Sequence, residues 1–214
     1  MNQIILLMGA PGSGKGTQGA LISEKLSIPH ISTGDVLRMM TNEDSVEARE
    51  LSKYISDGKM IPSDKMNLLV KTCLQKKEYS AGYILDGYPR NLDQLNYFKE
   101  NISNKFVVFF FDVDEKIAIK RVTGRFSCSS CGKLYNKFFS MPKVKDHCDV
   151  CGHKEFNHRV DDQEEIIRHR LKEFYINTMP VIELLKNKNN FFIIDAAKSM
   201  KEIVYQVNDI IKKI

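Results

Sequence analysis

Four short apolar runs stand out along the chain because none of them alternates polar and apolar positions, as a strand with one exposed face would. They cover residues 4–8, 83–85, 106–111 and 191–194, and turn-forming residues flank each one. Continuous apolar runs of this length are typical of strands that are buried on both faces of a parallel sheet. Residues 30–32 form a fifth, shorter candidate strand.

Apolar residues with helical spacing fill the intervals between these runs. The expected helices cover residues 17–25, 114–123, 162–177 and 199–212. Ser199 and Glu202 have the spacing of a capping box at the start of the last helix. Strands that alternate with helices predict an α/β fold, in which a doubly wound, parallel five-stranded sheet is flanked by helices.

Two segments interrupt this alternation. Residues 33–62 are polar and helical, whereas residues 124–162 are rich in Gly, Lys, Cys and aromatic residues. We expect both to be insertions into one core domain, which is made of residues 1–32, 63–123 and 163–214.

The segment GAPGSGKGT, at residues 9–17, carries the strongest chemical signal. Its glycines allow the backbone to form a concave nest of N–H groups, the following helix adds the positive end of its dipole, and Lys15 adds a mobile charge. This pattern predicts a phosphate-binding loop (P-loop) and hence a nucleotide ligand. Gly16 stands where a magnesium-binding hydroxyl usually follows the lysine, and Thr17 comes one residue later. The alternative, a glycine-rich turn without a ligand, gives no reason for a lysine here.

The composition narrows the class of protein. With 214 residues, 43% of them hydrophobic and 28% charged, the chain can bury a sizeable core, which excludes a disordered or fibrous protein. The net charge of +5 suits anionic ligands, but the lysines are scattered, so binding to an extended nucleic acid is not required. No apolar segment approaches the roughly 20 residues that cross a bilayer, and no basic leader precedes the first apolar run. We therefore expect a cytoplasmic protein that does not bind membranes.

Four cysteines form two C-x-x-C pairs with sixteen residues between them, and a glycine follows each pair. They are Cys128, Cys131, Cys148 and Cys151. This spacing predicts a structural zinc site with four thiolate ligands, because two tight turns can then converge on one ion. His147 and His153, next to the second pair, are alternative ligands. The rival interpretation is a redox-active cysteine pair.

Two further motifs each place an arginine near the end of a predicted strand. STGDVLR contains Arg38, and LDGYPR contains Arg90 with Gln94 following. Ligands of open parallel sheets bind at the carboxyl ends of the strands, so both arginines should face the same cavity as the loop 12–17. Asp86 ends its strand and is well placed to orient hydrated Mg²⁺.

With these motifs in place, the chain resembles the adenylate kinases. The resemblance rests on GAPGSGKGTQ, ISTGDVLR, LDGYPR with Gln94, the segment 121–125, and RVDDQEE leading to Arg170, and it spans nearly the whole chain. The chain is specifically similar to the long-lid form, in which four cysteines bind zinc. The resemblance implies reversible transfer of the terminal phosphoryl group of Mg-ATP to AMP, giving two ADP. It also implies that residues 33–62 are an AMP-binding insertion and residues 124–162 a mobile lid.

By motif position, the resemblance assigns three sets of site residues. Those for ATP are Gly12, Ser13, Gly14, Lys15, Gly16, Thr17, Arg121, Arg125, Leu134, Tyr135 and Lys198. Those for AMP are Thr33, Arg38, Lys59, Met60, Ile61, Gly87, Tyr88, Pro89, Arg90, Gln94, Arg159 and Arg170. The catalytic cations are Lys15, Arg38, Arg90, Arg125, Arg159 and Arg170. An AMP phosphate oxygen is already anionic near neutral pH, so positioning and charge stabilisation can replace a general base.

The chain departs from the family pattern at Phe126, Asn136, Met141 and Ala196. These departures bear on the lid and on adenine packing rather than on phosphate binding. The sequence leaves open whether Phe126 stacks on a base or packs against the zinc site.

Two rival functions remain at this point. One is a different nucleoside monophosphate kinase, which accepts UMP or CMP or uses GTP; Gln94 and the zinc-bearing lid favour adenine instead. The other is a zinc-ribbon module that binds nucleic acid beside a regulatory NTPase. We expect a monomeric enzyme that acts on ATP, AMP and ADP and binds no nucleic acid.

Overall fold

A parallel sheet of five strands forms the centre of the computed structural model, which describes residues 3–214; residues 1 and 2 of the predicted core lie outside this range. The strands are β1 (Gln3–Gly9), β2 (His30–Ser32), β3 (Gly82–Asp86), β4 (Val107–Asp112) and β8 (Phe191–Asp195), in the order β2-β3-β1-β4-β8. Every predicted strand is present, with ends that differ by at most one residue. The predicted fold class is confirmed.

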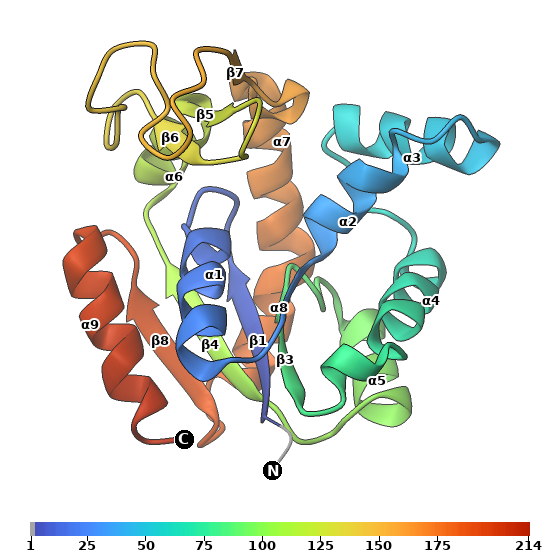
Figure 1. The fold of residues 1–214 in the computed structure, drawn as a ribbon. Helices are drawn as coiled ribbons and strands as arrows, with labels where there is room; N and C mark the ends of the chain where they lie inside the picture. The colour runs from blue at the N-terminus through green and yellow to red at the C-terminus, as the bar shows by residue number, and fades with distance from the viewer. Residues whose placement is uncertain (1–2) are drawn as a thin grey trace.

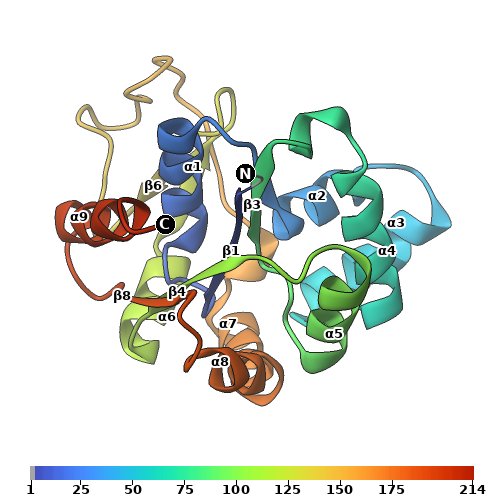
Figure 2. The ribbon, with the colours of Figure 1, turned by 90° about the horizontal axis from the view of Figure 1, so that it is seen from below.

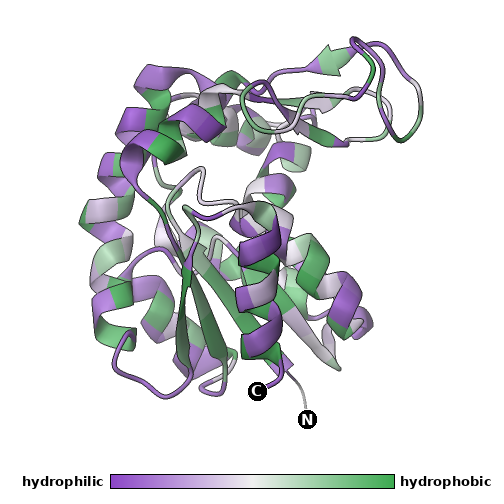
Figure 3. Ribbon diagram, turned by 90° about the vertical axis from the view of Figure 1, so that its left-hand side faces the viewer, coloured by the Kyte–Doolittle hydropathy of each residue, from purple (hydrophilic) through white to green (hydrophobic). Residues whose placement is uncertain are grey.

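The strands are buried on both faces, as their continuous apolar runs predict. Ile5 and Leu6 are neighbours in β1, so their side chains point to opposite faces of the sheet, and both are 0% exposed. Helices cover the two faces: α1 (Lys15–Leu26) and α9 (Met200–Ile211) lie on one side, and α6 (Glu115–Thr123) and α8 (Met179–Leu185) on the other (Figure 2). In Figure 3 the strands are hydrophobic along their length, whereas the helices carry hydrophilic residues on their outer surfaces.

The remaining helices complete the core and one of the two interrupting segments. They are α2 (Thr33–Met40), α3 (Val46–Ser56), α4 (Ser63–Leu74), α5 (Leu92–Asn101) and α7 (Glu164–Glu173). The capping box at the start of α9 is present: Ser199 Oγ accepts a hydrogen bond from the Glu202 N–H, and Glu202 Oε2 accepts one from the Ser199 N–H. Among residues 3–214, no helix is both long and apolar enough to cross a membrane.

The single helix predicted for residues 162–177 is wrong in detail. A 3-10 turn (Val160–Asp162) precedes α7, and a π-helical turn (Phe174–Thr178) joins α7 to α8, which the sequence did not predict. Pro180 lies in the first turn of α8, where its missing N–H has no intrahelical partner in any case. A wide π turn immediately before it changes the phase of the helix without ending it.

The two segments that interrupt the strand–helix alternation lie beyond the carboxyl ends of the strands (Figure 1). The helical segment (residues 33–62) contains α2 and α3. The cysteine segment (residues 124–162) contains a small antiparallel sheet of β5 (Arg125–Cys128), β6 (Leu134–Asn136) and β7 (Phe156–Asn157), in the order β6-β5-β7. Any ligand at the carboxyl edge of the large sheet is therefore flanked by both segments.

Candidate active site and metal centre

The glycine-rich loop joins β1 to α1 in a backbone conformation that requires glycine. Gly12 and Gly14 both have φ of 85°, a left-handed value that other residues rarely adopt. A Cβ atom on Gly12 would lie 2.4 Å from the carbonyl oxygen of Ala118, so the loop packs directly on the backbone of α6. Within the described residues, no side chain caps the first turn of α1. The N–H groups of this turn therefore remain available to an anion.

Lys15 lies at the start of α1 among other cations. Burial, together with the charges of Arg90, Arg170 and Arg125, lowers the pKa of Lys15 to about 8, while Asp86 acts in the opposite direction. Its ammonium group donates a hydrogen bond to the Ala10 carbonyl at 3.3 Å. Positive charges from four distant parts of the sequence therefore converge at one place.

Asp86 explains why glycine replaces the usual hydroxyl residue after Lys15. A Cβ atom on Gly16 would lie only 3.2 Å from Asp86 Oδ2, so a larger side chain would crowd this carboxylate. Asp86 is buried at the end of β3, and its Oδ2 lies 3.7 Å from Nε2 of His30. The sequence suggested no role for His30 at the site; the pairing of β2 with β3 is what brings it there. A buried carboxylate beside the loop fits a hydrated magnesium ion, which oxygen ligands suit.

The LDGYPR motif folds into a tight turn after β3. The Thr33 hydroxyl donates to the Asp86 carbonyl at 3.0 Å, and Arg90 Nε donates to the Gly87 carbonyl at 2.6 Å. Gln94 is buried, and its Oε1 accepts a hydrogen bond from the Arg90 backbone at 2.8 Å. A Cβ atom on Gly87 would lie 2.8 Å from the Thr33 hydroxyl, so only glycine fits between these groups.

Carboxylates and arginines connect the helical segment to the cysteine segment. Asp35 lies 2.5 Å from Arg38 of its own segment and 3.4 Å from Arg159 of the other. Asp161 lies 2.7 Å from Arg170 and 3.9 Å from Arg38. Burial opposes ionisation of Asp35, but the hydrogen bond and charge of Arg38 outweigh it and lower the pKa of this carboxyl.

Arg159 and Arg170 remain charged near neutral pH. Burial and neighbouring arginines lower the pKa of both Arg159 and Arg170 to about 10. Burial also lowers the pKa of Arg90. Arg125 forms a bidentate ion pair with Asp162. Four of the arginines expected at the site are thus paired with carboxylates, namely Arg38, Arg125, Arg159 and Arg170.

Several other predicted contact residues are either exposed or engaged with the protein itself. Lys59 is exposed and paired with Asp57 at 2.8 Å, next to Met60 and the buried Ile61. The Tyr88 side chain is buried beside Pro89, and its hydroxyl donates to Asn67 at 2.6 Å, so it supports the fold. Leu134 and Lys198 are exposed. Their assigned contacts with nucleotides remain predictions.

Two aromatic residues that the sequence analysis did not single out lie next to a predicted ATP residue. The guanidinium of Arg121 lies 5.8 Å from the ring centre of Phe139, and Lys120 Nζ lies 5.0 Å from that of Phe138. Both rings are about half exposed. Two adjacent aromatic residues in an otherwise polar segment are the sequence feature that could have identified them. An exposed ring beside a cation can stack on a nucleotide base.

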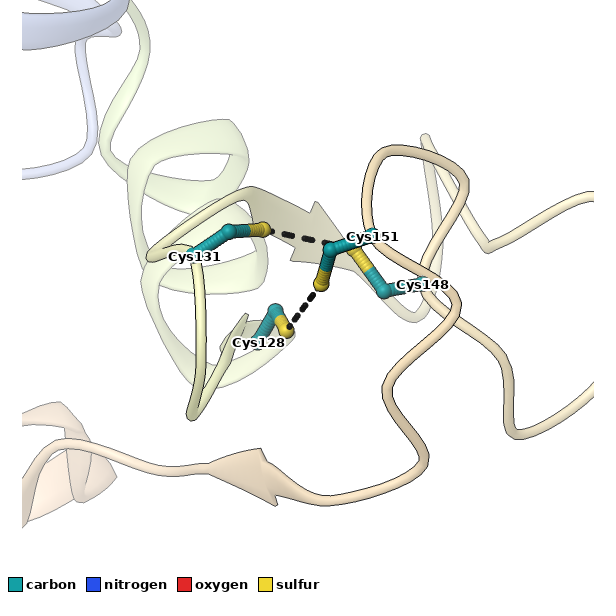
Figure 4. Close-up of side chains that lie close together, drawn as sticks. All are labelled: Cys128, Cys131, Cys148 and Cys151. Carbon is teal, nitrogen blue, oxygen red and sulfur yellow. Dashed lines mark hydrogen bonds between the residues drawn. The ribbon is translucent and has the colours of Figure 1, made fainter.

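The four cysteines converge in space as predicted (Figure 4). Their sulfur atoms all lie within 4.8 Å of one another, and two pairs are in hydrogen-bond contact, Cys128–Cys151 at 3.6 Å and Cys131–Cys148 at 3.5 Å. A zinc–sulfur bond of about 2.3 Å gives a sulfur–sulfur distance of about 3.8 Å in a regular tetrahedron. A disulfide would need about 2.05 Å. The cluster therefore fits zinc, and both sulfur contacts join the two motifs rather than forming a redox pair within one.

The two histidines considered as alternative ligands are not part of this cluster. His147 Nδ1 lies 2.8 Å from the Lys145 carbonyl, and His153 Nε2 lies 3.7 Å from Glu155. Gly132 and Gly152 have φ values of 71° and 73°, so each C-x-x-C turn does need its glycine.

Aromatic rings pack beneath the cysteines and decide the question about Phe126. Its ring stacks on Tyr135 at 5.6 Å and meets Phe156 edge-on at 5.3 Å, so it packs against the cysteine cluster. Burial raises the pKa of the Cys148 thiol, but hydrogen bonds from Tyr135 and from backbone N–H groups outweigh it and lower this pKa to about 6. A thiolate, the form that binds zinc, is thereby favoured.

Comparison with known proteins identifies the family. A family model described as Adenylate kinase matches residues 7–190. The adenylate kinase of Rickettsia africae (strain ESF-5) is 43% identical over 209 residues, which cover 98% of this chain and 99% of that protein. The adenylate kinase of Rickettsia prowazekii (strain Madrid E) is 41% identical over 210 residues, with the same coverage. The chain therefore belongs to the adenylate kinase family, the phosphotransferases that convert ATP and AMP into two ADP.

Proposed function

We propose that this chain transfers the terminal phosphoryl group of Mg-ATP to AMP in the space between the P-loop, the helical segment and the cysteine segment. The observation that carries the proposal is the convergence of Lys15 with Arg90, Arg125 and Arg170: the charges of these arginines lower the pKa of Lys15, and those of Arg90 and Arg125 lower the pKa of Arg170. Such mutual repulsion is relieved when polyanions bind. Two nucleotides that meet end to end supply this negative charge.

On the donor side, we assign ATP phosphates to the loop of residues 12–17 and to Arg121 and Arg125. The loop offers N–H groups and a helix N-terminus, and Lys15 can follow the phosphoryl group as it moves. Adenosine would lie along the backbone of residues 134–135 and Lys198, within reach of the exposed ring of Phe139. The magnesium ion that accompanies ATP neutralises phosphate charge, and Asp86 would orient it through water.

On the acceptor side, we assign the AMP phosphate to Arg38, Arg90, Arg159 and Arg170, and the adenine edge to Gln94. Thr33, Gly87 and the backbone of residues 59–61 would enclose the nucleoside. Three of these arginines hold Asp35 or Asp161 in the free protein. Phosphate oxygens offer the same planar guanidinium group equivalent acceptors, so binding exchanges a carboxylate for a phosphate.

The transfer needs no general base. An oxygen of the AMP phosphate is anionic near neutral pH, and the arginines hold it in line with the terminal phosphoryl group of ATP. The same cations stabilise charge on the transferring group and exclude water when the two segments close over it.

We further propose that the four cysteines hold a structural zinc ion and that the cysteine segment acts as the lid. Four protein ligands leave no open coordination position, so zinc would crosslink two turns and take no part in the transfer. The helical segment would be the AMP-binding insertion. We also propose that the protein works as a monomer in the cytoplasm, without nucleic acid, which size-exclusion chromatography and RNA-binding measurements at low and high salt would test.

The decisive experiment supplies Mg-ATP with AMP, UMP, CMP or GMP in turn and separates the nucleotide products. We expect ADP to accumulate rapidly with AMP and far more slowly with the others. Preferential phosphorylation of UMP or CMP would contradict the acceptor assignment. A failure to form any diphosphate would contradict the function as a whole.

A further inference from the structure

One hydroxyl group outside the cysteine set makes direct contact with the metal centre. The Tyr135 hydroxyl lies 3.4 Å from Cys148 Sγ, and it accepts a hydrogen bond from the Asp149 backbone N–H at 2.7 Å. Tyr135 belongs to β6, whereas Cys148 lies in the second C-x-x-C turn. This contact therefore links the two halves of the cysteine segment, independently of the metal.

The direction of the hydrogen bond to sulfur follows from its neighbour. A phenol hydroxyl has one proton to donate, and a backbone N–H can only donate. Because the Asp149 N–H already donates to the Tyr135 oxygen, the hydroxyl proton is left for Cys148 Sγ. A hydrogen bond to a charged acceptor is about twice as strong as one between neutral groups, so this donor favours the thiolate that zinc requires.

The ring of Tyr135 is held in place by the aromatic residues around it. Phe126 stacks on it with an interplanar angle of 22°, and Phe156 meets it at 81° with 5.7 Å between the ring centres. Tyr135 is 3% exposed. The hydroxyl thus points at the sulfur from a fixed position and cannot turn to water instead.

The four sulfur ligands differ in their access to solvent. Cys131 and Cys151 are exposed, so water can solvate their thiolates, whereas Cys128 and Cys148 are buried. A buried thiolate depends on protein donors. Among the described residues, Cys148 is the cysteine that a non-cysteine side chain reaches with a hydrogen bond.

We propose that Tyr135 is a positioning residue for the zinc site: its hydroxyl orients the Cys148 thiolate and slows the loss of metal. This inference rests on the proposed zinc site. It also separates Tyr135 from the donor nucleotide, because the side chain faces the cysteines and leaves the backbone for any contact with adenosine.

The test compares zinc-loaded wild-type protein with Tyr135→Phe, which removes the hydroxyl and keeps the ring. Zinc release to a chromogenic chelator should be about tenfold faster in the variant, since removing an outer-shell partner of a metal ligand typically costs 10–100-fold in affinity. In the cobalt-substituted proteins, the sulfur-to-cobalt charge-transfer band should shift, because one thiolate loses its donor. A purely structural role would leave that band unchanged.

Two control variants make the result specific. Phe156→Leu loosens the same aromatic packing but keeps the hydroxyl, so it should release zinc more slowly than Tyr135→Phe and leave the cobalt band in place. Tyr83→Phe removes a buried hydroxyl of β3, far from the cysteines in the sequence, and should release zinc at the wild-type rate. Equal release rates and unshifted bands in Tyr135→Phe and Phe156→Leu would overturn the inference.

Metal analysis of the wild-type protein separates this inference from the one beneath it. One zinc per chain, together with wild-type release and spectrum in Tyr135→Phe, would refute the role of Tyr135 and leave the zinc site standing. If purified native protein neither contains nor takes up zinc, both the zinc site and the role of Tyr135 are refuted.

Discussion

The central sheet and the cysteine segment are held together by different means. One large cluster of buried apolar side chains holds the sheet and its helices together. Its residues come from all five strands and from most of the helices. The cysteine segment has a separate small cluster, in which Cys128, Tyr135 and Cys148 are buried and Phe126 and Phe156 pack against them. Units of about 40 residues or fewer usually need a metal ion or disulfides to fold. Burial thus stabilises the core, whereas the cysteine segment, with so small a cluster, depends on the zinc site that we propose.

Replacing Lys15 with methionine separates chemistry from stability in the core and should have the largest effect on activity. Lys15→Met keeps the loop backbone but removes the charge beside the phosphates, so turnover should fall by about 10³-fold, in line with the loss of one strong electrostatic contact. The melting temperature should stay within a few degrees of the wild-type value. A coupled assay of ADP formation measures turnover, and calorimetry measures the melting temperature. Near-normal turnover would refute the role of Lys15.

Removal of zinc should break the lid and leave the sheet intact. Without the crosslink, the small cluster cannot hold the cysteine segment, so its backbone should become open to proteolysis and hydrogen exchange. A loss of a few kcal/mol corresponds to roughly 10 °C in melting temperature for a protein of this size. Turnover should fall by a smaller factor, and strands β1, β3 and β4 should keep their protection. Exchange that rises equally in both regions would show that they form one cooperative unit.

Shortening one buried side chain in the sheet provides the converse experiment. Leu85 in β3 is 0% exposed, so Leu85→Ala should lower the free energy of unfolding by about 2–5 kcal/mol through lost burial and a cavity. The rate of zinc release should not change, because the lid cluster contains no part of β3. Denaturant unfolding and the chelator assay measure the two quantities on the same sample. Faster zinc release in Leu85→Ala would mean that the lid depends on the packing of the sheet.

Sequence patterns predicted the sheet well because burial on both faces leaves a direct signature. A continuous apolar run such as residues 106–111, too short for a buried helix and bounded by turn-forming residues, is typical of a buried strand. The cysteine cluster was equally predictable, since paired C-x-x-C turns limit the geometry. The π turn at Phe174–Thr178 left no such signature, because its residues are ordinary in a helix and only tertiary packing sets its phase.

Contacts between distant segments were the part that the sequence could not supply. Gly16 reads as a departure from the P-loop pattern until Asp86 is seen beside it. Asp35 and Asp161 look like ordinary acidic residues near helix starts, yet Asp35 pairs with Arg159 of the cysteine segment and Asp161 with Arg38 of the helical segment. Phe126 had two interpretations, which only the position of the Tyr135 ring could separate. For Gly16, Asp35 and Asp161 the deciding partner lies far away in the chain, whereas Tyr135 is near Phe126 in the sequence and meets it through the register of β5 with β6.

The smallest predicted effect concerns pH and distinguishes the charged core site from the lid. Lys15 has a pKa of about 8 in the free protein, lowered by burial and by Arg90, Arg125 and Arg170, and opposed by Asp86. Because kcat/KM reports the groups of the free enzyme, kcat/KM for ATP should be level below about pH 7, reach half of that value near pH 8 and then fall by about tenfold per unit as Lys15 loses its proton. The stability of the free protein should change in the opposite direction. The unfolded chain, with a lysine pKa near 10.5, binds more protons than the folded protein between pH 8 and 10.5, so the free energy of unfolding increases as pH rises through this range.

The variant Lys15→Arg provides the control for the pH dependence of activity. Its side chain stays charged throughout this range, so its kcat/KM should not fall above pH 8, whatever its absolute rate. A fall at the same pH in this variant would assign the titration to another group.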